Sequence, residues 1–118
     1  MVSEPGCYTE RVVPEVSPAQ VGEDAVILDV REDDEWSAGH APNARHLPMM
    51  QVPVRLEEIP RDQDVVVVCR VGSRSAQVVA YLLHQGYDRV TNLDGGMFAW
   101  EASGRPLVGD GQRPAFVL

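Results

Sequence analysis

Cys69 stands at a point in the sequence where a thiol could act as a nucleophile. It follows four consecutive valines, Val65–Val68, and precedes a helix-like segment that starts at about residues 73–75. The unpaired N–H groups and the positive dipole end of such a helix would face the sulfur and favour the thiolate over the thiol. Arg70 and Arg74 bring further positive charge close by in sequence. A buried structural cysteine needs no such surroundings, so we interpret Cys69 as a catalytic nucleophile.

The segment that follows Cys69 predicts a loop that holds an anion. Its residues are Arg70, Val71, Gly72, Ser73, Arg74 and Ser75. Gly72 permits a left-handed backbone, in which successive N–H groups can turn toward one centre. A cysteine phosphatase would have its clamping arginine at the position of Ser75, and a nucleotide phosphate loop would need a lysine. The shorter ring suits a smaller target, namely the terminal sulfur of thiosulfate or a persulfide on Cys69 itself.

Composition limits the classes of protein that the chain can belong to. Its 118 residues fit one domain, expected over 1–118, and no apolar run approaches the roughly 20 residues needed to cross a membrane. The net charge of -8 argues against binding to nucleic acid or to an anionic membrane. The start of the sequence lacks the basic and apolar segments of a secretory signal, so we expect a cytoplasmic protein. Cys7 and Cys69 are then both expected to remain thiols.

The elements that would position Cys69 alternate between strand and helix. The expected strands are residues 12–16, 25–30, 44–47, 64–69 and 89–93. Helix candidates are a segment that starts at Pro18 with Ser17 as its N-cap, and residues 33–38, 51–58, 75–84 and 97–103. In the fourth of these the apolar face is expected to hold Ala76, Val79, Ala80 and Leu83. This alternation predicts an α/β domain with a mainly parallel sheet and helices on both faces, and Cys69 at the carboxyl end of its most apolar, central strand.

Four segments resemble one known family. "CRVGSRS" (69–75) is similar to the active-site loop of single-domain rhodanese-like sulfurtransferases. "LDVREDDEWSAGHAPNARHLP" (28–48), "GYDRVTNLDGGMFAW" (86–100) and "SGRPL" (103–107) are similar to the family's other signatures. The resemblance covers about residues 12–107, which leaves an extension over 1–11 and a tail over 108–118. Asn43 stands where the family usually has glycine, and asparagine tolerates the left-handed backbone of that turn.

The resemblance implies a five-stranded, mainly parallel sheet and a two-step sulfur transfer. Cys69 would take the outer sulfur of thiosulfate or a related donor as a covalent persulfide, held by the N–H groups of residues 70–75, with no cofactor and no metal. The acceptor would be cyanide in an assay and a small thiol or a protein thiol physiologically. An alternative stays open, in which the domain is a persulfide carrier or a non-catalytic binding module that serves a partner protein.

Residues outside the loop are expected to play supporting roles. Arg70 and Arg74 are the expected contacts for the substrate anion, and Arg74 is the better candidate for holding the loop itself. Asp29 and Arg31 are expected to form a structural ion pair near the site, as the resemblance implies. His40 is expected to be a hydrogen-bonded turn residue rather than a general base. His46 and His84 stand alone on different elements, which gives no metal-site spacing, and Cys7 is interpreted as a bystander thiol.

Overall fold

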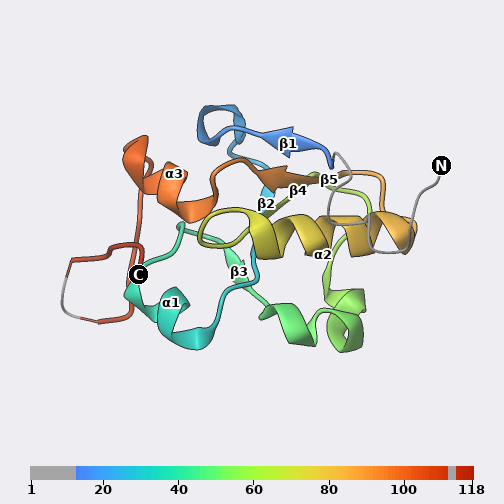
Figure 1. Cartoon of the computed structure of the whole chain (residues 1–118), viewed down its shortest axis with the longest axis horizontal. Helices are drawn as coiled ribbons and strands as arrows, with labels where there is room; N and C mark the ends of the chain where they lie inside the picture. Colours follow the sequence, from blue (N-terminus) through green and yellow to red (C-terminus); the bar gives the residue numbers. More distant parts are fainter. Residues whose placement is uncertain (1–12, 112–113) are drawn as a thin grey trace.

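Five parallel strands form the central sheet (Figure 1). The computed structural model describes residues 13–111 and 114–118. The strands are β1 (Glu15–Val16), β2 (Val26–Asp29), β3 (Arg45–His46), β4 (Val65–Val68) and β5 (Val90–Leu93), in the order β1-β5-β4-β2-β3. Every pairing between these strands is parallel, and β4 lies at the centre. The predicted α/β class and the central position of the strand before Cys69 are confirmed.

Helices cover both faces of this sheet. The α-helices are α1 (Asp33–Ala38), α2 (Ser73–His84) and α3 (Gly96–Ala102). Val65 and Val67 of β4 pack in the same core as α2, whereas Val66 and Val68 pack with α3. This alternation follows from the strand period of two, and all four valines are buried. Each contributes about 1.5–3 kcal/mol of burial free energy, so the continuous apolar run stabilises both layers at once.

Three further helical segments are 3-10 helices: η2 (Pro18–Gln20), η3 (Met49–Gln51) and η4 (Pro53–Glu58). The single helix expected over residues 51–58 is therefore wrong. Arg55 has φ -121° and ψ 28°, which lies outside the helical region and prevents continuous α-helical hydrogen bonding through the segment. The helix that starts at Pro18 ends after one short turn, with Ser17 as its N-cap.

The tail after α3 returns to α1. Val108 and His40 exchange two main-chain hydrogen bonds of 2.8 Å, and Phe116 N donates to Ala38 O at 3.0 Å. In Figure 1 the end of the chain accordingly lies close to α1. Across the described residues, no helix has the length and apolar character that spanning a bilayer requires.

Candidate active site

The sulfur of Cys69 lies in a cradle of hydrogen-bond donors at the carboxyl end of β4. Its Sγ accepts from Gly72 N at 3.1 Å, from Ser75 N at 3.3 Å and from the Ser75 hydroxyl at 3.2 Å. The cysteine has no exposed surface in this structure. Two amides and a hydroxyl directed at one buried sulfur form an environment that accommodates negative charge on that atom.

Gly72 makes this cradle possible because it turns the chain sharply. Its φ is 105° and its ψ is -7°, a left-handed conformation that side-chain-bearing residues rarely adopt. The turn starts α2 at Ser73, at the early end of the range 73–75 that the sequence predicts. The first turn of α2 thus points its free N–H groups back toward Cys69, as the sequence analysis expected from the strand-loop-helix order.

The start of α3 supports the loop from the other face of the sheet. Met97 N donates to Cys69 O at 2.7 Å, and Phe98 N donates to Arg70 O at 2.9 Å. Gly96 permits this close approach, since a Cβ there would lie 2.6 Å from Cys69 O and from Arg70 O. In the sequence, the only signal of this role of Gly96 is the adjacent glycine pair before a helix.

Arg74 joins the loop to α1 instead of lying free in solvent. Its two terminal nitrogens donate to the two carboxylate oxygens of Glu35, each at 2.9 Å. The hydrogen bonds from Arg74 lower the pKa of Glu35 from 4.5 to about 2. The same pairing raises the pKa of Arg74, and the charge of Cys69 adds to that effect. Arg74 therefore connects the start of α2 to α1, and its positive charge interacts with Cys69.

Arg70 makes different contacts from Arg74. Its Nε donates to Leu118 O at 2.9 Å, and its guanidinium carbon lies 5.8 Å from the centre of the Phe98 ring. Val71, the next residue of the loop, is 51% exposed. The two arginines expected to contact the substrate are thus separated: one is paired with α1, and the other rests against the tail.

Asp29 and Arg31 form a fully buried ion pair next to the site. Arg31 donates to both Asp29 oxygens, with the shortest contact at 2.8 Å from Nη2, and the same nitrogen donates to Gly39 O at 2.7 Å. This pair connects the end of β2 to the end of α1. His40 Nδ1 lies 2.8 Å from Trp36 O, and its ring stacks on Trp36 at 3.6 Å. The contacts of these three residues are directed at the surrounding chain rather than at the Cys69 sulfur.

Asn92 on β5 is a polar residue of the site that the sequence analysis missed. It is 2% exposed and lies behind the loop. Its side chain contacts Ser75 Oγ at 2.5 Å, Gly72 O at 3.2 Å and Glu15 Oε2 at 3.1 Å. The only signal in the sequence was an amide in the middle of a short apolar strand, where a buried polar group needs a partner. Cys7 lies outside the described residues, and its role stays a prediction.

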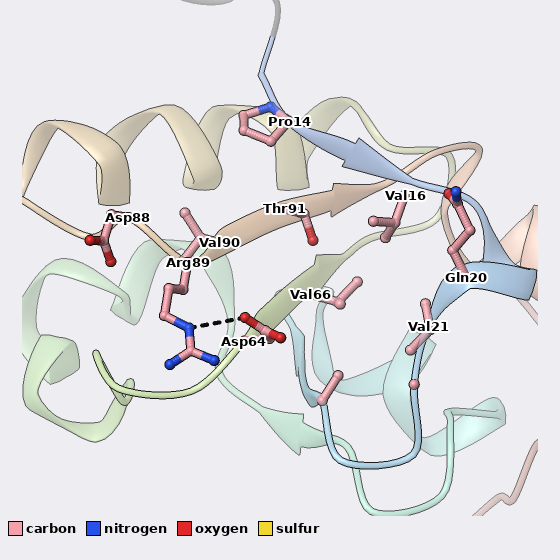
Figure 2. Close-up of a pocket in the computed structure, with 12 residues that line it drawn as sticks. Pro14, Val16, Gln20, Val21, Asp64, Val66, Asp88, Arg89, Val90 and Thr91 are labelled. Atoms are coloured by element: carbon pink, nitrogen blue, oxygen red, sulfur yellow. Dashed lines mark hydrogen bonds and ion pairs between the residues drawn. The ribbon is translucent and has the colours of Figure 1, made fainter.

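A hollow of about 370 Å³ lies at the opposite end of the sheet from Cys69 (Figure 2). Val66 and Thr91, from the early parts of β4 and β5, form part of its floor. Figure 2 shows Arg89 reaching Asp64 at its rim, a contact of 3.0 Å. None of the residues that line this hollow belongs to the loop 69–75, so it is separate from the site around the thiol.

Comparisons with known proteins agree with this geometry. A family model described as Rhodanese-like domain matches residues 15–103. A sulfurtransferase of Allochromatium vinosum is 50% identical over 86 residues, covering 73% of this chain and 80% of the relative. A thiosulfate sulfurtransferase of Pseudoalteromonas translucida is 37% identical over 81 residues, covering 69% and 77%.

Solved structures lead to the same family. The crystal structure of a rhodanese-related protein from Thermoplasma volcanium matches with a TM-score of 0.73 and 28% identity, covering 80% of this chain and 97% of that one. The names of the sequence relatives support a transferase activity of the sulfurtransferase type. The extent of the family match, together with the cysteine loop at the end of β4, shows that the chain belongs to the rhodanese-like domain family.

Proposed function

We propose that this protein moves sulfane sulfur from thiosulfate or a related donor to a nucleophilic acceptor through a persulfide on Cys69. The observation that carries this proposal is the set of three donors on one sulfur: Gly72 N, Ser75 N and the Ser75 hydroxyl. They are suited to an atom that is anionic before the reaction. In the persulfide the negative charge moves from Sγ to the outer sulfur, one bond away. That sulfur still lies beside the same helix start.

The first half-reaction forms the persulfide. The Cys69 thiolate attacks the outer sulfur of thiosulfate and forms a new S–S bond. The S–S bond within thiosulfate breaks, and its electron pair leaves with sulfite. The products are sulfite and a Cys69 persulfide, and the total charge is conserved when sulfite leaves as its dianion and the persulfide carries the remaining negative charge. The buried position of the cysteine favours a donor with a narrow reactive end, because a bulky one would have to displace the loop.

The second half-reaction returns the enzyme to its starting state. Cyanide or a thiolate attacks the outer sulfur of the persulfide, and the S–S bond breaks with its electron pair on Cys69. Thiocyanate or a new persulfide leaves, and the Cys69 thiolate is restored. Covalent storage between the two steps predicts ping-pong kinetics. Arg74, held by Glu35, keeps a charged group in electrostatic contact with Cys69 in both steps.

Intact-mass spectrometry after thiosulfate treatment tests the proposal. The wild-type protein should gain the mass of one sulfur atom and lose it again on addition of cyanide. The Cys69→Ser variant should gain none, while Cys7→Ser is the matched control and should gain as much as wild type. A wild-type protein that takes up no sulfur, or a Cys69→Ser variant that takes up as much, would refute the proposal.

A steady-state assay then separates an enzyme from a carrier. A free sulfurtransferase should turn over many times with thiosulfate and either cyanide or a small thiol, with parallel lines in double-reciprocal plots. A protein that loads once and releases sulfur to neither acceptor would be a carrier for a dedicated partner.

A further inference from the structure

One side chain contacts both residues that hold the Cys69 sulfur. Asn92 Oδ1 lies 2.5 Å from Ser75 Oγ, and Asn92 Nδ2 donates to Gly72 O at 3.2 Å. Gly72 and Ser75 are the residues whose donors reach Sγ. The amide therefore does not contact the sulfur itself but forms hydrogen bonds with both Gly72 and Ser75.

The orientation of this amide is fixed by its neighbours. Nδ2 has two partners that only accept, the carbonyl of Gly72 and the carboxylate of Glu15 at 3.1 Å. Glu15 lies beside Asn92 because the two residues are paired in register between β1 and β5. With Nδ2 so engaged, Oδ1 faces the hydroxyl of Ser75 and can accept its proton. The amide is almost completely buried, so water does not compete for these bonds.

Ser75 has one hydroxyl proton and two acceptors for it. The Asn92 oxygen lies at 2.5 Å and the Cys69 sulfur at 3.2 Å. When Cys69 is a neutral thiol, the Ser75 hydroxyl donates to the Asn92 oxygen. A thiolate is the stronger acceptor, because the hydrogen bond to it is charge-assisted. A small rotation about the Ser75 Cβ–Oγ bond exchanges the two arrangements without moving a heavy atom. The distance between Oγ and the amide decides how easily that exchange occurs.

We propose that Asn92 is a positioning residue for sulfur transfer, holding the Ser75 hydroxyl and the Gly72 peptide where they contact the reacting sulfur. This inference rests on the proposed function, because its effect is measured on the formation of the Cys69 persulfide. The amide contacts the cradle at both ends: Oδ1 faces the Ser75 hydroxyl, and Nδ2 donates to Gly72 O, which also accepts from Ala76 N at 3.1 Å. A side chain that provides only one of these contacts should position only half of the cradle.

The variant Asn92→Asp tests this requirement through pH. An ionised carboxylate accepts from Ser75 but repels Gly72 O and Glu15, so the single-turnover rate constant of sulfur loading should fall about 10- to 100-fold near neutral pH. A protonated carboxyl group both accepts and donates, as the amide does. Burial and Glu15 of β1 raise the pKa of the introduced group, with Cys69 the other titratable group near it through Ser75. The ratio of variant to wild-type rate should therefore rise as pH falls.

Two controls separate positioning from folding. Asn43→Asp makes the same chemical change in a turn with φ 65°, which aspartate tolerates, and its rate ratio should stay near one at every pH. Rates are compared only where circular dichroism shows both proteins folded. Should Asn92→Asp fail to fold, Glu15→Ala removes the exposed partner of Nδ2 and should still lower the loading rate, by a few-fold.

A double-mutant cycle completes the test. If Asn92 acts through the hydroxyl, Asn92→Asp should cost much less in a Ser75→Ala background than in the wild-type background. A folded Asn92→Asp variant that loads sulfur at the wild-type rate would overturn the inference, as would a loss that is independent of both pH and Ser75. A wild-type protein that fails to load sulfur would instead refute the proposed function, so the two failures are distinguishable.

Discussion

The guanidinium of Arg74 and the carboxylate of Glu35 meet in two parallel hydrogen bonds of 2.9 Å, across 39 positions of sequence. This contact joins the first turn of α2, which holds the Cys69 sulfur, to the first turn of α1. The pair is partly shielded, with the Glu35 side chain 14% exposed. Bidentate geometry fixes both the distance and the plane of the two groups, so the helix starts cannot shift independently.

Loss of the charge on Glu35 should loosen the loop. Glu35→Gln keeps the size of the side chain but replaces a charge-assisted pair by a neutral one, so we expect the free energy of unfolding to fall by about 1–2 kcal/mol. The rate of sulfur loading should also fall. Glu58→Gln is the matched control, because Glu58 forms a similar bidentate pair with Arg55 on exposed η4. Equal effects of both variants on loading would contradict a role for the Arg74 contact.

The Glu35 carboxylate should make the free energy of unfolding fall in acid. Its pKa is about 2 in the folded protein and 4.5 as an ordinary glutamate, so the folded state binds its proton less readily. The stabilisation is complete above pH 4.5 and is lost as pH falls toward 2. Urea unfolding of wild type and Glu35→Gln across this range should show the wild-type advantage shrinking as acid is added. A constant difference between the two proteins would show that Glu35 titrates normally.

Local patterns were enough to predict the centre of the sheet but only part of the buried face of α2. Four adjacent valines indicate a strand covered on both faces, and β4 is that strand. Of the predicted face of α2, Val79 is fully buried and Ala76 and Ala80 pack partly buried against the core, whereas Leu83 is 37% exposed. The buried residues of the helix are Ser75, Val78, Val79 and Leu82. Ser75 faces the Cys69 sulfur, and this contact fixes which side of α2 packs on the sheet. The residues three, four and seven positions after Ser75 therefore lie in the core. Hydrophobicity alone assigns a serine to the surface.

Contacts between distant segments could not be predicted from the sequence. The loop around Cys69 is local, so the resemblance and the strand-loop-helix order were sufficient to locate it. The pairing of Arg74 with Glu35 depends on how α1 and α2 meet, and the role of Asn92 depends on β5 lying next to β4. Parallel strands are joined by long crossovers, so sequence spacing gives no information about which side chains meet.

The buried pair of Asp29 and Arg31 should be costly to break from one side. Asp29→Asn leaves the Arg31 charge buried without a counter-charge, and we expect a loss of about 3–5 kcal/mol in the free energy of unfolding. Asp64→Asn is the matched control, since the Asp64–Arg89 pair is exposed and should cost only about 0–1 kcal/mol. Chemical denaturation of both variants measures the difference. Similar losses would mean that Arg31 reaches solvent or another partner once Asp29 is neutral.

The contact between Gly39 and the tail can be broken by one methyl group. A Cβ at Gly39 would overlap the main chain of Phe116, while the φ of 174° at Gly39 is an extended angle open to any residue. Gly39→Ala should therefore displace residues 114–118 and release Arg70 from Leu118, without straining its own backbone. Hydrogen exchange should become faster in that segment alone. Gly22→Ala, with no atom within 4 Å of the added carbon, is the control and should change nothing there. Unaltered exchange over residues 114–118 in Gly39→Ala would show that the tail does not rest on α1 in solution.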